Sequence, residues 1–408
     1  MIDLKKHIAV ALTYFLVVAL MGVLLRAFFV TSIPLNYKFI LHAHSHTALL
    51  GWIYLGLTTL IYKIFLSEAQ KPKLYKRIFI YTNICILGML ITFPIQGYAL
   101  FSIIFSTLFL FASYWFAWFA MMYIPRHFKN RFSWRLIKTA LWYLVISSIG
   151  LWTIGGVMAT LGPESIWYKT SIYFYLHFQY NGWFILVLLG VLFYIFEENG
   201  VKFNPQKLKY FFLLLNFGVL FTVFLSVLWF VPHVILYILG LAGAVAQGLA
   251  FYELYLLLKD HFPLIKKSFA PWAFFFLKIA GGLLVVKLLM QLFSALPYVA
   301  NLSFQLKDFV IGYLHLVFLG IVITSLLAFL KYFELLLLPK SFVVLYLLGF
   351  ITTESLIFYK AIAFWLGLPF FQHYYICLAV LSCLFPIAVG ILLFRNLRAV
   401  RSGLFFNL

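Results

Sequence analysis

The chain has 408 residues, of which 65% are hydrophobic and only 10% are charged, and its formal net charge is +20. Soluble domains carry roughly 25% charged residues, so this composition excludes a soluble globular protein and leaves lipid as the surrounding solvent. The basic residues lie in short loops between apolar segments. This is the positive-inside pattern of membrane proteins, and it indicates lipid headgroups rather than nucleic acid as the partner of the basic loops.

Apolar runs follow one another along the whole chain, and each is long enough for a membrane-spanning helix of about 20 residues. The runs are continuous and lack two-residue alternation, which favours helices over a β-barrel. The first run, from Ile8 to Val30, is too long for a signal peptide and lacks a small-residue cleavage site. We therefore predict an all-α integral membrane protein with a single membrane domain and about twelve transmembrane helices, at approximately 7–31, 39–62, 76–94, 99–123, 137–161, 170–196, 209–230, 234–258, 270–294, 309–332, 341–362 and 372–395.

The distribution of Lys and Arg between alternate loops predicts the orientation of these helices. One set of loops, together with both ends of the chain, holds nearly all the loop charges, whereas the other set holds only Lys38, Lys169 and Lys307. Both termini are therefore expected in the cytoplasm. Seven of the ten histidines then lie at or near the non-cytoplasmic side, namely His42, His44, His46, His177, His233, His315 and His373.

A histidine followed five residues later by glycine recurs in the second, sixth and tenth predicted helices, as His46–Gly51, His177–Gly182 and His315–Gly320. The histidines are 131 and 138 residues apart (177 − 46 and 315 − 177), which is four helices each time. Such periodicity marks internal repeats in membrane proteins. We predict three pseudo-repeated four-helix arcs within the membrane domain, at about 1–135, 136–268 and 269–408.

A histidine inside a membrane span is costly unless it is paired, so it is a functional candidate. Imidazole binds iron, copper and zinc, and a glycine one turn further on lets a flat macrocycle or a neighbouring helix approach the backbone. The alternative is that each histidine only donates a hydrogen bond across helices. The threefold recurrence favours the functional interpretation.

The second helix holds the densest group, because His42, His44 and His46 fall within five residues. His42 and His46 are four residues apart and share a helix face, whereas His44 points elsewhere. A separate zinc or copper site at this point is an alternative for which the sequence offers no obvious fourth ligand.

Twelve helices in three four-helix arcs, with histidines in helices 2, 6 and 10, resemble the catalytic subunit I of the haem–copper oxidase superfamily. This superfamily includes the cytochrome oxidases and the nitric oxide reductases. The resemblance implies that His46 and His315 are the two axial ligands of a low-spin haem b, with His42 in the same cluster. Arg26, near the outer end of helix 1, would then pair with haem propionates or reach lipid headgroups.

The resemblance also implies a second metal, copper or non-haem iron. His177 takes the place of the family's helix 6 ligand to that metal, and His233 and His44 are further candidates. Two departures are visible. Tyr313 stands where the family has the ligand of its substrate-binding haem, and His233 alone follows helix 7 where the family has a histidine pair. The low-spin haem site therefore looks complete and the reaction centre incomplete.

What the resemblance implies for function is electron transfer, which the family couples to reduction of oxygen or nitric oxide. It further implies a cytochrome or quinol electron donor, accessory subunits and the inner membrane of a bacterium. The alternative is a non-enzymatic haem or metal protein of the same fold, such as a sensor or handling factor, and Tyr313 favours it. An unrelated membrane acyltransferase using His177 and Asn181 would explain neither the repeat nor the cluster from His42 to His46.

Several other polar residues fall at membrane depth, and they suggest a proton route from the cytoplasm toward the histidines. The alternative for those near helix ends is snorkelling toward the headgroups. Snorkelling is the preferred interpretation for Lys278 and Glu253. The full set comprises Lys278, Lys287, Glu354, Glu253 and Gln247.

Overall fold

The computed structural model describes residues 2–401, and the regular elements of this part of the chain are all helices. Twelve helices are long and apolar enough to cross a membrane, which confirms an all-α integral membrane protein with twelve spans. Each overlaps a span that the sequence predicts, with ends that differ by at most ten residues (258 predicted, Ser268 observed). The observed spans are Leu4–Ala27, Tyr37–Ala69, Pro72–Gln96, Leu100–Tyr123, Phe132–Thr160, Ile166–Glu198, Pro205–Phe230, Val234–Ser268, Pro271–Ser294, Lys307–Tyr332, Lys340–Leu366 and Tyr374–Arg401.

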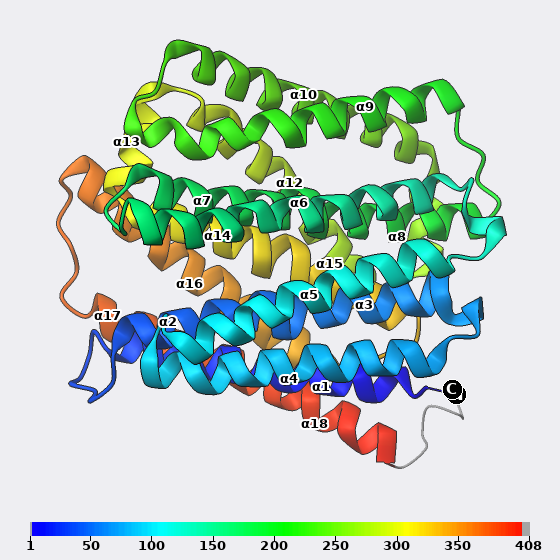
Figure 1. Cartoon of the computed structure of the whole chain (residues 1–408), viewed down its shortest axis with the longest axis horizontal. Coiled ribbons are helices and arrows are strands. Elements are labelled where there is room, and N and C mark those ends of the chain that lie inside the picture. Colours follow the sequence, from blue (N-terminus) through cyan, green and yellow to red (C-terminus); the bar gives the residue numbers. More distant parts are fainter. Residues whose placement is uncertain (1, 402–408) are drawn as a thin grey trace. The chain divides into compact units, whose positions relative to one another are not determined.

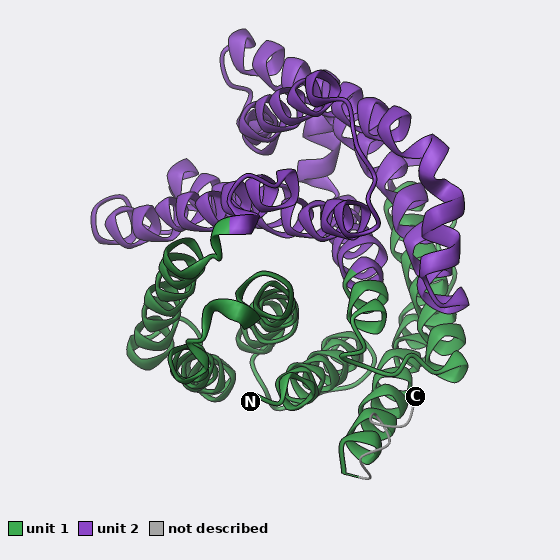
Figure 2. Cartoon of the chain, turned by 90° about the vertical axis from the view of Figure 1, so that its right-hand side faces the viewer, with its two compact units in different colours: residues 1–126, 326–363, 367–408 green, residues 127–325, 364–366 purple. Residues whose placement is uncertain are grey.

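The chain divides into two compact units, which Figure 2 colours separately. Unit 1 comprises residues 1–126, 326–363 and 367–408, and unit 2 comprises residues 127–325 and 364–366. The elements of unit 1 are α1 (Leu4–Ala27), α2 (Tyr37–His46), η1 (Thr47–Tyr54), α3 (Leu55–Ile61), η2 (Tyr62–Leu66), η3 (Ser67–Ala69), α4 (Pro72–Gln96), α5 (Leu100–Tyr123), most of α15 (Thr324–Tyr332) and α16 (Lys340–Leu366), α17 (Tyr374–Ser382) and α18 (Leu384–Arg401). Within it, α1 packs against η1 and α18, and α4 packs against α2 and α5.

Unit 2 contains the middle of the chain, and Figure 1 shows its helices α9 and α10 side by side. Its α6 packs against α7, η5 and α8, and its α12 packs against η8 and α10. The elements, after η4 (Arg126–Phe128) at the boundary, are α6 (Phe132–Thr160), α7 (Ile166–His177), η5 (Phe178–Phe184), α8 (Ile185–Glu198), α9 (Pro205–Phe221), η6 (Thr222–Phe230), α10 (Val234–Leu258), η7 (Lys259–His261), α11 (Phe262–Ser268), α12 (Pro271–Ser294), α13 (Pro297–Gln305), α14 (Lys307–His315) and η8 (Leu316–Ile323).

The three histidine-bearing spans are the most deeply buried of the twelve. Within their most apolar windows, 94% of the residues of Tyr37–Ala69, 83% of Ile166–Glu198 and 72% of Lys307–Tyr332 are buried, whereas no other span exceeds 50%. A helix that is apolar on all sides packs against protein on all sides, and the remaining spans leave one face for lipid. The helices that carry His46, His177 and His315 are therefore each enclosed largely by protein.

Each of these histidines is the last residue of an α-helix and is followed at once by a π-helix, η1, η5 or η8. π-Helices are rare, and they occur frequently at functional sites. Their hydrogen bonds join residues five apart, which is the spacing between each histidine and its glycine. The recurring sequence motif thus coincides with a recurring backbone distortion that a plain helix prediction does not reveal.

The glycines of the first two motifs are positions of close helix contact. A Cβ atom on Gly51 would lie 3.0 Å from Cβ of Tyr14 on α1, and one on Gly182 would lie 2.6 Å from Cβ of Tyr143 on α6. Both tyrosines belong to the span that precedes the histidine span. Glycine is needed at these two positions because any larger side chain would push the two helices apart.

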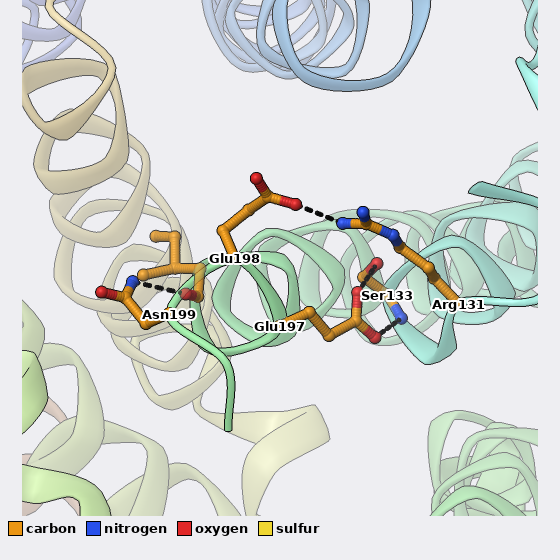
Figure 3. Close-up of polar contacts among 6 residues, drawn as sticks. Arg131, Ser133, Glu197, Glu198 and Asn199 are labelled. Carbon is orange, nitrogen blue, oxygen red and sulfur yellow. Dashed lines mark hydrogen bonds and ion pairs between the residues drawn. The ribbon is translucent and has the colours of Figure 1, made fainter. Parts of the chain in front are cut away.

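One end of the α6–α8 pair is fastened by two carboxylates, which Figure 3 shows. Glu197 accepts hydrogen bonds from the backbone N–H of Ser133 (3.0 Å) and from its hydroxyl (2.5 Å). It therefore caps the N-terminus of α6, where unpaired N–H groups favour a negative charge. Glu198 forms an ion pair with Arg131, and the hydrogen bond between them raises the pKa of the Arg131 guanidinium above its ordinary value.

Candidate functional site

The His46 cluster consists of His42, His46, Phe93 and Tyr98, all in unit 1. The Nδ1 atom of His46 lies 2.9 Å from the backbone carbonyl oxygen of His42, and its Nε2 atom lies 3.2 Å from the hydroxyl of Tyr98. The His46 ring also lies 4.5 Å from the ring of Phe93, and the His42 ring meets Tyr98 edge-on at 4.6 Å. The predicted pairing of His42 and His46 on one face of a helix is therefore confirmed.

These contacts assign the proton on His46. A carbonyl oxygen only accepts, so Nδ1 carries the hydrogen and donates it to His42, and Nε2 accepts from Tyr98. Donation from one ring nitrogen to a backbone carbonyl fixes the tautomer and orientation of many metal-binding histidines, and leaves the lone pair of the other nitrogen for the metal. His46 has the same hydrogen bond to a carbonyl, and the hydroxyl of Tyr98 lies on its other ring nitrogen, Nε2.

His44 and Arg26, two other candidates from the sequence, lie elsewhere in unit 1. The Nδ1 atom of His44 lies 3.1 Å from the carbonyl oxygen of Val18 on α1, so His44 faces the first span rather than His46. Arg26 lies in the last turn of α1 and is partly exposed. Its position suits a cation, because the C-terminal end of a helix carries partial negative charge.

The His177 network lies within unit 2 and consists of His177, Asn181, Thr222, Gln247 and Lys287, all buried. The Nε2 atom of His177 lies 2.8 Å from the carbonyl oxygen of Val219 on α9, and its Nδ1 atom lies 3.2 Å from Nδ2 of Asn181. Lys287 donates to Oδ1 of Asn181 (2.6 Å) and to Oε1 of Gln247 (3.1 Å). The network joins residues that are up to 110 positions apart in the sequence (287 − 177).

The donors in this network can be assigned from Lys287. A lysine nitrogen donates to Asn181 Oδ1, so the amide of Asn181 presents Nδ2 to His177. Nδ1 of His177 therefore accepts, and Nε2 carries the hydrogen that Val219 receives. Both ring nitrogens of His177 are engaged, which distinguishes it from His46.

Tight packing of α9 against α10 positions the other end of the network (Figure 1). Cβ atoms built on Gly218 and Gly243 would lie only 2.4 Å from Gln247 and 2.6 Å from Thr222. Gln247 donates to the hydroxyl of Thr222 (3.3 Å), which in turn donates to the carbonyl oxygen of Gly218 (2.6 Å). The amide of Gln247 is thereby oriented with its oxygen toward Lys287.

The structure separates His233 from His177. The helix that provides the Val219 carbonyl continues as the 3₁₀-helix η6, whose nine residues rise by about 18 Å at about 2.0 Å each. His233 follows η6, is exposed, and accepts a hydrogen bond from the backbone N–H of Ile235 as the cap of α10. Among the described residues, no group of three or more His, Cys, Asp and Glu is arranged to hold a metal ion.

His315 ends α14 directly before η8, in the same local setting as His46 and His177. Tyr313, two residues earlier, packs its ring edge-on against Tyr180 of η5, at 6.1 Å between ring centres. The position at which the resembled family has a haem ligand is thus occupied by an aromatic contact inside unit 2.

Sequence reasoning missed two residues that the structure places in the sites. Tyr98 lies in the loop after α4 and contacts His42 and His46 of α2, and the sequence offers no signal beyond that loop position. Asn181 is the second residue. Its spacing of four from His177 is the available signal, because residues four apart on a helix are neighbours.

No model of a known protein family matches the chain, and a comparison with characterised proteins also found no match.

Proposed function

We propose that this chain is a haem-binding membrane protein related to the catalytic subunit I of the haem–copper oxidases, built from three pseudo-repeated four-helix arcs. The observation that carries the proposal is the common setting of His46, His177 and His315. Each lies in one of the three most buried spans and ends an α-helix immediately before a π-helix. Unrelated helices would have no reason to share this combination, whereas duplicated units would.

The cofactor in this proposal is a low-spin haem b, which His46 and His315 would hold. His46 fits this role, because its Nδ1 is held by a carbonyl and its Nε2 points toward the exposed side chain of Tyr98. A haem bound by two imidazoles supplies reversible one-electron exchange. The chain itself would orient the ligand through His42, move the Tyr98 hydroxyl aside, and provide Arg26 as a cation for propionate groups.

The partners and location follow from the same proposal. The lipid bilayer is the partner that twelve spans require. Both termini would lie in the cytoplasm of a bacterium, with the protein in the inner membrane. A cytochrome or a quinol would donate electrons, and accessory subunits would complete the assembly.

A visible absorption spectrum of the purified protein, made with ample haem supply, tests the proposal. The expected result is a reduced-minus-oxidised difference spectrum of a six-coordinate, low-spin b-type haem. A colourless protein that is correctly inserted in the membrane would contradict it.

A specific observation favours the non-enzymatic version of this function, a haem-based electron carrier or sensor. Reduction of oxygen or nitric oxide needs a haem with an open position and a second metal nearby. Both ring nitrogens of His177 already have hydrogen-bond partners, and Tyr313 packs against Tyr180. We expect haem without copper or non-haem iron, and no shift of the reduced spectrum with carbon monoxide. Near-stoichiometric second metal with carbon monoxide binding would instead identify a terminal reductase, with His177, His233 and His44 as its ligand candidates.

A further inference from the structure

Lys287 is an amine enclosed within a membrane span. It lies 16 residues after the start of α12 and 7 before its end, which places it about 24 Å and about 10 Å from the two ends of the helix. Its residue exposure is 1%. A lysine near a helix end can extend its ammonium to the headgroups, but Lys287 instead turns inward to α7, η5 and α10.

The two oxygens that receive its hydrogen bonds belong to uncharged amides, Asn181 at 2.6 Å and Gln247 at 3.1 Å. The amide nitrogen of Asn181 is held by His177, and the amide nitrogen of Gln247 is held by Thr222. Among the described residues, no carboxylate forms an ion pair with Lys287. The site therefore solvates an amine with fixed dipoles and provides no opposite charge.

Few other titratable groups lie near this amine. His177 is connected through Asn181, and Tyr180 precedes Asn181 in η5. Glu253 lies on α10 six residues beyond Gln247, about 9 Å along the helix. The remaining charged groups of the elements packed against α12 are Lys266 and Lys267 of α11, which lie near the opposite end of α12.

The hydrogen-bonding capacity of the site suits two charge states. A neutral amine has two N–H groups, and Asn181 and Gln247 accept both. An ammonium has three. Gln291 lies one turn further along the same face of α12, is 6% exposed, and its Oε1 atom has no hydrogen-bond partner among the described residues. This oxygen is the acceptor that a third N–H would need.

We propose that Lys287 is a proton-binding site within the membrane, which alternates between an amine with two donated hydrogen bonds and an ammonium with three. Uptake adds one proton from bulk water to the lone pair of Nζ and raises the charge of the protein by one. The new N–H donates to Oε1 of Gln291, while the bonds to Asn181 and Gln247 persist. Gln291 Oε1 is not hydrogen-bonded to Nζ in the structure, so the Gln291 side chain must turn toward Lys287 to form the third bond. His177 retains its tautomer in both states. This proposal does not depend on haem.

Nuclear magnetic resonance of protein labelled with ¹⁵N at lysine Nζ, in lipid nanodiscs, tests the proposal. Absence of one signal in Lys287→Met assigns Lys287, and Lys278→Met assigns the exposed lysine of the same helix as a matched control. The Lys287 signal is expected to move between amine and ammonium positions within the pH range in which the protein stays folded. The Lys278 signal gives the behaviour, under the same conditions, of a lysine on the same helix that is exposed. A Lys287 signal that stays at one position throughout would overturn the proposal.

Two further variants keep the test decisive if Lys287→Met is not recovered. Gln291→Leu retains the lysine and removes the third acceptor, so it should weaken proton affinity roughly tenfold, the effect of one hydrogen bond to a charged group. An unchanged titration in Gln291→Leu would show that Gln291 has no part in the site. Lys287→Arg fixes the positive charge, because guanidinium does not lose its proton in proteins. Its yield of folded protein should fall below that of Lys287→Met, and the reverse order would contradict a neutral state.

Discussion

The His46 cluster of unit 1 and the His177 network of unit 2 start from the same backbone arrangement, but their histidines have different freedom. His46 is partly exposed, and its Nε2 atom contacts the hydroxyl of Tyr98, an exposed residue. His177 is 2% exposed and donates and accepts within a closed chain of buried partners. The comparison indicates that the recurring motif places an imidazole directly before a π-helix. The neighbours of each imidazole then determine whether both ring nitrogens are held by buried groups, as in His177, or one nitrogen faces an exposed hydroxyl, as in His46.

The largest expected effect is the loss of stability when His177 is replaced by alanine, and this loss should exceed that caused by the same replacement of His46. His177→Ala removes a buried ring and leaves the Val219 carbonyl and the Asn181 amide without partners. It should lower the free energy of unfolding by about 2–4 kcal/mol. His46→Ala should cost less than about 1 kcal/mol, because its ring is partly exposed. Thermal or denaturant unfolding in detergent measures both, and equal losses would remove the distinction.

Substitution of the motif glycine should also cost more stability in unit 2, at Gly182, than in unit 1, at Gly51. Gly182→Ala places a methyl group 2.6 Å from Tyr143, so it should destabilise by about 1–3 kcal/mol. Gly51→Ala meets Tyr14 at 3.0 Å and should cost less. Gly155→Ala is the control, because a Cβ there has nothing within 4 Å. A control as harmful as Gly182→Ala would show that the cost does not come from helix contact.

The two carboxylates that join α6 to α8, Glu197 and Glu198, should contribute unequally to the free energy of unfolding. Glu197→Ala removes the cap from a buried serine at the start of α6 and should cost about 1 kcal/mol. Glu198→Ala breaks a partly exposed ion pair and should cost about 0.5 kcal/mol or less. Unfolding of the two variants measured side by side checks this order, and a larger loss for Glu198→Ala would reverse it.

The smallest expected effect is at Tyr98, where it appears in binding rather than stability. Tyr98→Phe keeps the ring contacts with His42 and Phe93 but removes the hydroxyl from His46. Loss of one competing hydrogen bond of about 1 kcal/mol should tighten haem binding roughly fivefold. Haem titration of the apo-protein measures the change. Weaker binding in Tyr98→Phe would show that the hydroxyl assists the cofactor.

Hydrophobic run length was sufficient to predict the positions of all twelve spans, because bilayer thickness imposes the same requirement on every helix. The π-helices after His46, His177 and His315 could not be predicted in this way, since they depend on how η1, η5 and η8 pack against neighbouring spans. The pairing of His42 with His46 followed from spacing along one helix. The partners of Lys287 did not, because Asn181 and Gln247 come from helices 106 and 40 residues earlier in the chain. Local chemistry could be predicted where one helix determines it, and not where several helices must meet.

The haem content of three single variants, measured by the pyridine haemochrome method together with the visible spectrum, tests the central claim most directly. His46→Ala and His315→Ala should lose the six-coordinate, low-spin spectrum while still inserting in the membrane. His177→Ala should retain it in whatever fraction of the protein folds. Retention of the low-spin spectrum by His46→Ala, or its loss from folded His177→Ala, would contradict the account that His46 is the ligand and His177 the structural histidine.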